Sequence, residues 1–164
     1  MIGQLYYYLA ALIGVGFLLG GAIAGLLSLR DLILPGDFTS SDEAIAGMLH
    51  GLTFVLIGVA CLWWHLREAR RREERPHREV FWGRSLYFHL VAALSLGFVL
   101  TGLALSLNAL VELVVPRCGV ADGGCFPSSR DDVRLLVNGG IVLLVSGPVW
   151  FWHLRQGRAL TRPA

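Results

Sequence analysis

Long runs of apolar residues dominate the pattern along the chain. Two of them, 5–29 and 86–115, exceed the roughly 20 residues that cross a hydrocarbon core as a helix. Two shorter runs, 45–64 and 135–152, contain no Asp, Glu or Arg and are still long enough to span. The pattern therefore predicts an all-α integral membrane protein, a bundle of four transmembrane helices.

Composition agrees with this pattern. Apolar residues make up 55% of the 164 residues and the mean hydropathy is +0.61, more than a soluble domain of this size needs. No basic residue precedes the first run, which is longer than the core of a secretory signal, so we expect a retained helix. The sequence holds no Walker loop, nucleophile elbow or His-Glu-x-x-His motif, and the middles of the spans lack charged residues. These features argue against a soluble-type enzyme and against an ion relay.

The arginines orient the predicted bundle. Segments 67–84 and 155–162 carry ten of the fourteen basic residues against four acids, whereas 30–43 and 112–134 carry the other four against eight acids. The positive-inside rule then predicts a multi-pass protein of the inner cell membrane with both termini in the cytoplasm. The net charge of +2 thus reflects membrane topology rather than a nucleic-acid partner. The run Arg70-Arg71-Arg72 beside a helix end is typical of contact with anionic headgroups.

The two halves of the chain resemble each other at offsets of 81 and then 88 residues. Matching positions include Gly16 with Gly97, Gly21 with Gly102, Gly51 with Gly139, and segment 64–67 with 152–155. A two-helix unit returns the chain to its starting side, so we expect parallel repeats related by a pseudo-twofold axis along the membrane normal. The single domain, 1–164, would comprise repeat one at 5–70, a cytoplasmic linker at 71–84 and repeat two at 85–158.

Aromatic and basic motifs mark equivalent helix ends in both halves. The entries read Leu5-Tyr6-Tyr7-Tyr8-Leu9 and Leu86-Tyr87-Phe88-His89-Leu90, and the exits read Trp63-Trp64-His65-Leu66-Arg67 and Phe151-Trp152-His153-Leu154-Arg155. Over essentially the whole chain this pattern resembles a family of bacterial integral-membrane proteins of unknown function built from tandem two-helix units. The resemblance implies the architecture and no activity. His89 is a departure from the family pattern, in which this position looks more often like Tyr.

Histidines continue the small-residue faces of the predicted helices. His65, His89 and His153 each lie three or four residues from small side chains that recur along one helix face. Small residues mark the faces where membrane helices approach, so these histidines, with Tyr8, should point inward at one depth. One hypothesis is a cofactor site, with haem, another tetrapyrrole or a transition metal bound by the imidazoles. The alternative is that the histidines are packing residues or meet helix dipoles and headgroups at the interface.

Glycine and cysteine spacing adds two further predictions. Three Gly-xxx-Gly pairs fall within the predicted helices, namely Gly16 with Gly20, Gly21 with Gly25, and Gly47 with Gly51. They indicate tight packing within one chain or association with another membrane protein. Cys118 and Cys125, in a Gly-rich loop on the outer side, should form a disulfide worth roughly 2.5 kcal/mol of loop constraint. A redox-active or metal-binding pair is the alternative.

Two functions follow as hypotheses. The first is a non-catalytic protein that works by association in the lipid bilayer, as an accessory, assembly or oligomeric scaffold subunit beside other membrane subunits or copies of itself. The second is a haem- or pigment-binding protein that transfers electrons or interacts with quinone, with its site at the cytoplasmic end of the bundle. The absorption spectrum of the purified protein separates the two.

Overall fold

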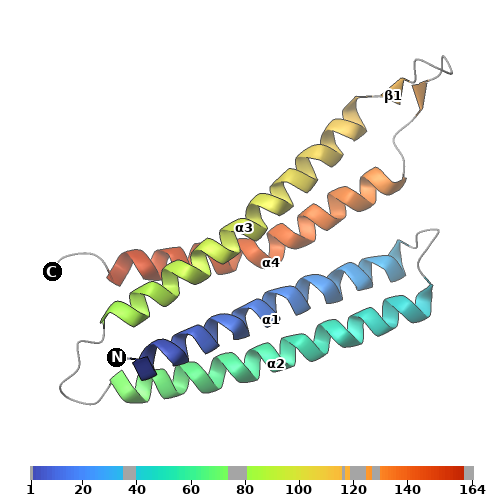
Figure 1. Ribbon diagram of the computed structural model, residues 1–164. Helices are drawn as coiled ribbons and strands as arrows, with labels where there is room; N and C mark the ends of the chain where they lie inside the picture. Colours follow the sequence, from blue (N-terminus) through green and yellow to red (C-terminus); the bar gives the residue numbers. More distant parts are fainter. Residues whose placement is uncertain are drawn as a thin grey trace.

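The computed structural model describes residues 2–34, 40–73, 81–115, 117–118, 125–126 and 130–160. Four long helices, α1 (Ile2–Ile33), α2 (Ser41–Glu73), α3 (Phe81–Val114) and α4 (Arg130–Leu160), account for nearly all of them (Figure 1). Each contains a span long and apolar enough to cross a membrane. The protein is therefore an all-α, four-helix membrane protein, as the apolar runs predict.

Most of the described helix surface is not covered by the rest of the chain. In the apolar 18-residue stretch that defines each span, only 11% to 33% of the residues are buried within the chain, and large apolar side chains on every helix are exposed. Such surfaces would be unstable in water and are ordinary for helices that face hydrocarbon. The small core contains mostly residues of α1 and α3, among them Leu19 and Val91, which are fully buried.

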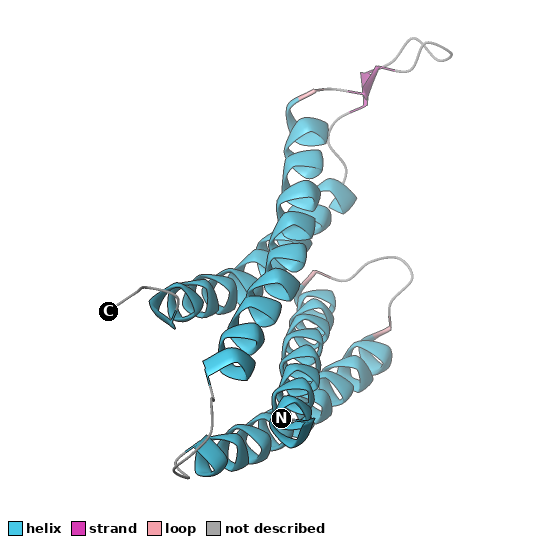
Figure 2. Ribbon diagram, turned by 60° about the vertical axis from the view of Figure 1, so that its left-hand side comes forward, coloured by secondary structure: helices cyan, strands magenta, loops and turns pink. Residues whose placement is uncertain are grey.

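The helices form two antiparallel hairpins, α1 with α2 and α3 with α4 (Figures 1 and 2). Helix α1 begins and helix α4 ends at one end of the molecule, called the terminal end below (Figure 1). The opposite end, where α1 leads to α2 and α3 leads to α4, is called the loop end. Helix α1 contacts both helices of the second hairpin, and the loop end of α3 stands away from it in both views.

Glycines set the close contacts inside both hairpins. In the first, a Cβ at Gly21 would lie 2.7 Å from the carbonyl oxygen of Gly51. In the second, a Cβ at Gly102 would lie 3.0 Å from the carbonyl oxygen of Gly139. These are the repeat-equivalent positions, so the same pairs of residues bring the helix backbones together in each half.

The helix boundaries differ from the predicted linker. Residues 71–84 were expected to connect the repeats, but α2 continues to Glu73 and α3 begins at Phe81. Straight-chain Arg and Glu favour helix, so α2 extends past its apolar span. Residues 74–80 lie outside the described part of the chain. At the other end of α2, Ser40 and Glu43 form a reciprocal capping box, with the Ser40 amide 2.9 Å from a Glu43 carboxylate oxygen.

Two short strands in the second loop were not predicted. Strands β1 (Arg117–Cys118) and β2 (Cys125–Phe126) pair antiparallel, and the register sets Cys118 opposite Cys125. The backbone thus brings the two cysteine positions together across the ladder. Their side chains lie outside the described residues, so the disulfide itself stays a prediction.

Candidate functional site

All four helices contribute to a cavity at the terminal end. It has a volume of about 150 Å³ and is named the terminal cavity here. Its lining comprises Tyr8 of α1; Leu62, Leu66 and Arg70 of α2; Arg84, Tyr87 and Phe88 of α3; and Trp152 and His153 of α4. That volume holds several waters and is smaller than the roughly 300–1,000 Å³ of sites for drug-sized ligands.

Aromatic rings from three helices form the wall of the terminal cavity. The Tyr8 and Tyr87 rings lie 5.5 Å apart between centroids, and the His153 ring lies 6.0 Å from Tyr87 and 5.7 Å from Phe88. Trp152 meets His153 edge to face at 4.6 Å. These separations suit offset and edge-to-face aromatic contacts. The cluster therefore joins α1 to the second hairpin at this end.

The helix backbone orients each candidate histidine in the same way. The Nδ1 atom of His153 lies 2.8 Å from the carbonyl oxygen of Val149, four residues earlier in the helix. The Nδ1 atoms of His65 and His89 each lie 2.7 Å from the corresponding carbonyl oxygens, those of Cys61 and Ser85. A carbonyl only accepts, so Nδ1 carries the proton and Nε2 is the acceptor in the neutral ring. The three rings are thus matched in tautomer, with the nitrogen that could bind a metal or a donor directed away from the backbone.

The four predicted cofactor ligands do not meet at one point. Tyr8 and His153 line the terminal cavity, whereas His65 and His89 are not among its lining residues. His65 packs beside the rings of Tyr6 and Tyr7, with centroid distances of 6.0 and 6.1 Å. Within the described residues, no three His, Cys, Asp or Glu side chains are grouped as metal ligands.

The separation of the histidines has a simple cause. Helix α2 turns its small-residue face to α1 and helix α4 turns its own to α3, so the two faces do not oppose each other. His89, on an exposed part of α3, covers Gly157 of α4, where an added Cβ would lie 3.1 Å from the imidazole. The arrangement supports the packing interpretation of His65 and His89, and it does not fit a tetrapyrrole held between His65 and His153.

A second candidate site is an apolar groove along α1, named the α1 groove. It has a volume of about 570 Å³ and lies between α1, Phe54 of α2 and Leu94 of α3. Its α1 lining is Leu12, Ile13, Gly16, Phe17, Gly20, Gly21 and Ala24. Phe17 stacks on Phe54 at 5.7 Å and closes one side.

The predicted glycine pairs divide between this groove and the hairpin interface. Gly21, Gly47 and Gly51 pack against the partner helix of the first hairpin. A Cβ added at Gly25 would lie 3.8 Å from the Cα of Gly51. A Cβ at Gly16 or Gly20, in contrast, would meet no atom within 4 Å. Packing inside the chain therefore accounts for two of the three pairs, and the pair on the α1 groove lies open.

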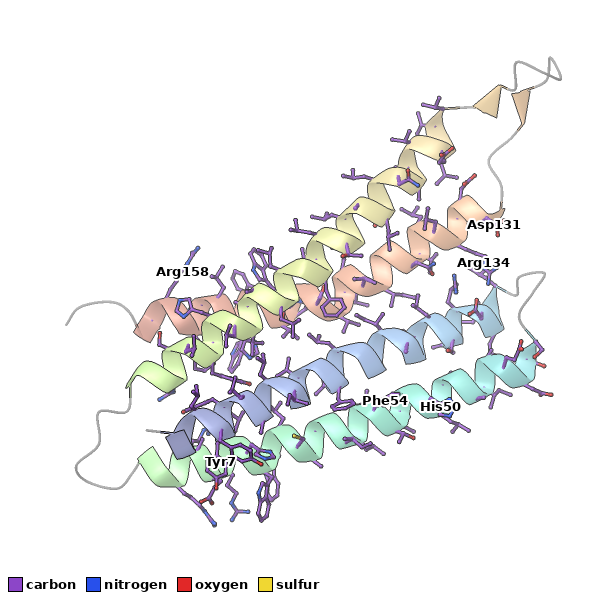
Figure 3. All side chains as sticks on the ribbon, in the orientation of Figure 1. Tyr7, His50, Phe54, Asp131, Arg134 and Arg158 are labelled. Atoms are coloured by element: carbon purple, nitrogen blue, oxygen red, sulfur yellow. The ribbon has the colours of Figure 1, made fainter. Side chains whose placement is uncertain are left out.

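Sequence reasoning missed a polar cluster at the loop end. Arg30 of α1 donates to the Asn138 amide oxygen of α4 at 2.7 Å, and Arg134 donates to the Asp31 carboxylate at 2.5 Å. Figure 3 shows Arg134 projecting from α4 beside the end of α1. A signal was present in the sequence: Arg30 and Asp31 follow the first apolar run, and Arg134 comes directly before the last one. The predicted topology places these two helix ends at the same side of the membrane.

These features define the protein as a four-helix integral membrane protein, with two hairpins joined through α1. Residues 4–116 match a domain of unknown function (DUF5671), which covers more than half of the chain. The chain belongs to the DUF5671 family, and the expected resemblance to an uncharacterised family is confirmed. Comparison with curated proteins and with solved structures gave no match.

Proposed function

We propose that this protein is a non-catalytic membrane subunit that acts by association, as an accessory, assembly or oligomeric scaffold component of a larger complex. The observation that carries the proposal is the open pair Gly16 and Gly20 on the α1 groove. Small residues allow another helix backbone to approach closely, and lipid chains fill such a surface less well than a fitted helix does. The other glycine pairs are already used inside the first hairpin.

The shape of the α1 groove supports a helix as its occupant. Its lining is almost wholly apolar, with Ile13 and Phe17 beside the glycines and more than a third of each side chain exposed. A partner helix seated there would bury both side chains and contact the bare backbone at Gly16 and Gly20. The interaction needs no hydrogen bond, so it suits the middle of a bilayer.

The proposal includes the position of the protein in the cell. We infer that it lies in the inner membrane with both termini in the cytoplasm, because the arginines gather at the terminal end. The acidic loop end, with the disulfide predicted between Cys118 and Cys125, would then face the oxidising side.

Purification in mild detergent from the native membrane tests the proposed association. We expect a particle larger than one chain, or a co-purifying membrane protein, and we expect Gly16→Leu/Gly20→Leu to remove it by filling the groove. Gly140→Leu is the matched control, because a Cβ at Gly140 also meets no atom within 4 Å and the position lies on α4, outside the groove. A monomer without a partner before any substitution, or an assembly unchanged by the groove variant, would overturn the proposal.

A further inference from the structure

Two surface pockets at the terminal end occupy equivalent places in the two halves of the chain. The first, named the α2 pocket, has a volume of about 510 Å³ and is lined by Val59, Leu62, Trp63, Leu66, Arg67, Arg70 and Arg71. The second, named the α4 pocket, has a volume of about 490 Å³ and is lined by Phe151, Leu154, Arg155, Arg158 and Ala159. At the repeat offset of 88 residues, every lining residue of the α4 pocket has its counterpart in the α2 pocket.

The shared residues have a shared chemistry. Each pocket contains an aromatic ring, a leucine three residues later, and arginines four and seven residues after the ring. Steps of three, four and seven place all four side chains on one face of a helix. The two pockets therefore share an amphiphilic set of four positions, although Trp63 in one is Phe151 in the other. The α2 pocket has a third arginine, Arg71, where the α4 pocket has Ala159.

Along each helix, the order of these residues matches the change from hydrocarbon to water across a membrane surface. Both α2 and α4 run toward the terminal end, so in each pocket the ring lies deeper and the arginines lie closer to water. Seven residues from ring to last arginine correspond to roughly 10 Å of helix at 1.5 Å per residue. The polar headgroup region on each side of a bilayer is roughly 5–8 Å thick, so the pocket reaches from the edge of the hydrocarbon through the headgroups.

The side chains are open to the surrounding lipid. Trp63 is 58% exposed and Phe151 is 61% exposed. The guanidinium of Arg67 lies 5.1 Å from the centre of the Trp63 ring, a cation–π contact that holds the charge beside the apolar part of the pocket. Arginine pairs bind phosphate through several N–H groups at once, which a single exposed charge does not.

We propose that the α2 pocket and the α4 pocket each bind the phosphate-bearing headgroup of an anionic phospholipid. In each pocket the two repeat-matched arginines hold the phosphate, and the ring and leucine pack against the glycerol and first methylenes of the acyl chains. Basic pockets beside transmembrane helices recognise anionic headgroups in this way. The chain would then carry two specific lipids, one for each half, independently of any protein partner.

Native mass spectrometry of the full chain in mild detergent, titrated with phosphatidylglycerol, tests this proposal. We expect two tightly bound lipids for each chain. Arg67→Gln/Arg70→Gln should leave one, Arg155→Gln/Arg158→Gln should leave one, and the fourfold variant should leave none. Arg75→Gln/Arg78→Gln is the control, because it removes the same charge from residues 74–80, which follow α2 in the sequence, and should keep both lipids.

Several outcomes would overturn the proposal. Equal loss of lipid in the control pair would show a general effect of charge, and equal binding of phosphatidylcholine would show that the anionic headgroup is not recognised. Displacement of the lipid by millimolar inorganic phosphate would assign the arginines to a free anion. Helical content measured by circular dichroism, unchanged in every variant, shows that the chains being compared are folded.

Discussion

The carboxylate of Asp31, near the end of α1, accepts a hydrogen bond of 2.5 Å from the guanidinium of Arg134, in the second turn of α4. Both side chains are 16% exposed, so the pair is partly shielded from solvent. Arg30 lies 2.8 Å from the same carboxylate oxygen and also reaches Asn138. This cluster joins the two hairpins at the loop end.

Loss of the Asp31 carboxylate should destabilise the fold. We expect Asp31→Asn to lower the free energy of unfolding by about 2 kcal/mol, because two largely buried guanidinium groups lose the carboxylate that both contact. Thermal unfolding in detergent, followed by circular dichroism, measures the change. Asp131→Asn is the matched control: its side chain is 88% exposed and 4.0 Å from Arg134, so the expected effect is below about 0.5 kcal/mol. Equal effects of the two variants would contradict the role of Asp31.

The glycine contact of the first hairpin predicts a steric effect. A Cβ at Gly51 would lie 2.6 Å from the amide nitrogen of Gly25 and 2.7 Å from the carbonyl oxygen of Gly21, and both are backbone atoms. Gly51→Ala should therefore force α1 and α2 apart and cost about 1–3 kcal/mol of unfolding free energy. Gly140→Ala, with open space around its Cβ position, should be neutral or slightly stabilising. An unchanged unfolding free energy in Gly51→Ala would show that α1 and α2 can move apart without loss of stability.

The register of β1 and β2 predicts the redox behaviour of the loop. With Cys118 opposite Cys125, we expect a disulfide in protein from oxidising conditions. A membrane-impermeant maleimide should label both cysteines on intact cells only after reduction, whereas Cys61, inside α2 with its Sγ 3.4 Å from the Ala10 carbonyl oxygen, should need denaturation. Labelling that occurs only in broken cells would place the loop end in the cytoplasm and reverse the proposed topology.

The separation of the histidines predicts the spectrum of the purified protein. Because His65 and His153 do not share a cavity and the terminal cavity is about 150 Å³, we expect no Soret band after purification from cofactor-replete native membranes. The ultraviolet–visible absorption spectrum measures this directly. A Soret band that disappears in His65→Ala/His153→Ala would instead establish the haem-binding alternative.

The apolar runs were sufficient to predict four membrane helices, because a bilayer requires each spanning segment to satisfy its own backbone hydrogen bonds. The repeat matched Gly21 with Gly102 and Gly51 with Gly139, but only the structure shows that these glycines meet across the hairpin in each half. Helix ends were less predictable: residues 71–84 were expected to form a linker, yet α2 continues as far as Glu73 and α3 begins at Phe81.

The candidate site was harder to predict than the fold. A small-residue face indicates that a helix is approached, but it does not say by which neighbour, so the faces carrying His65 and His153 were assigned to one common interior. In the structure each face meets its own hairpin partner. For the same reason, sequence alone did not separate Gly16 and Gly20, which lie open, from Gly47 and Gly51, which are packed.

The contacts made by α1 determine how a force on one hairpin is transmitted to the other. The first hairpin meets the second chiefly through α1, at the Tyr8–Tyr87 pair near the terminal end, in the buried core that includes Leu19 and Val91, and at the Asp31–Arg134 pair near the loop end. A load applied to α2 by a bound partner therefore reaches α3 and α4 mainly through α1. Weakening the Asp31–Arg134 pair would free the loop ends first, while the core and the aromatic pair still held the hairpins together.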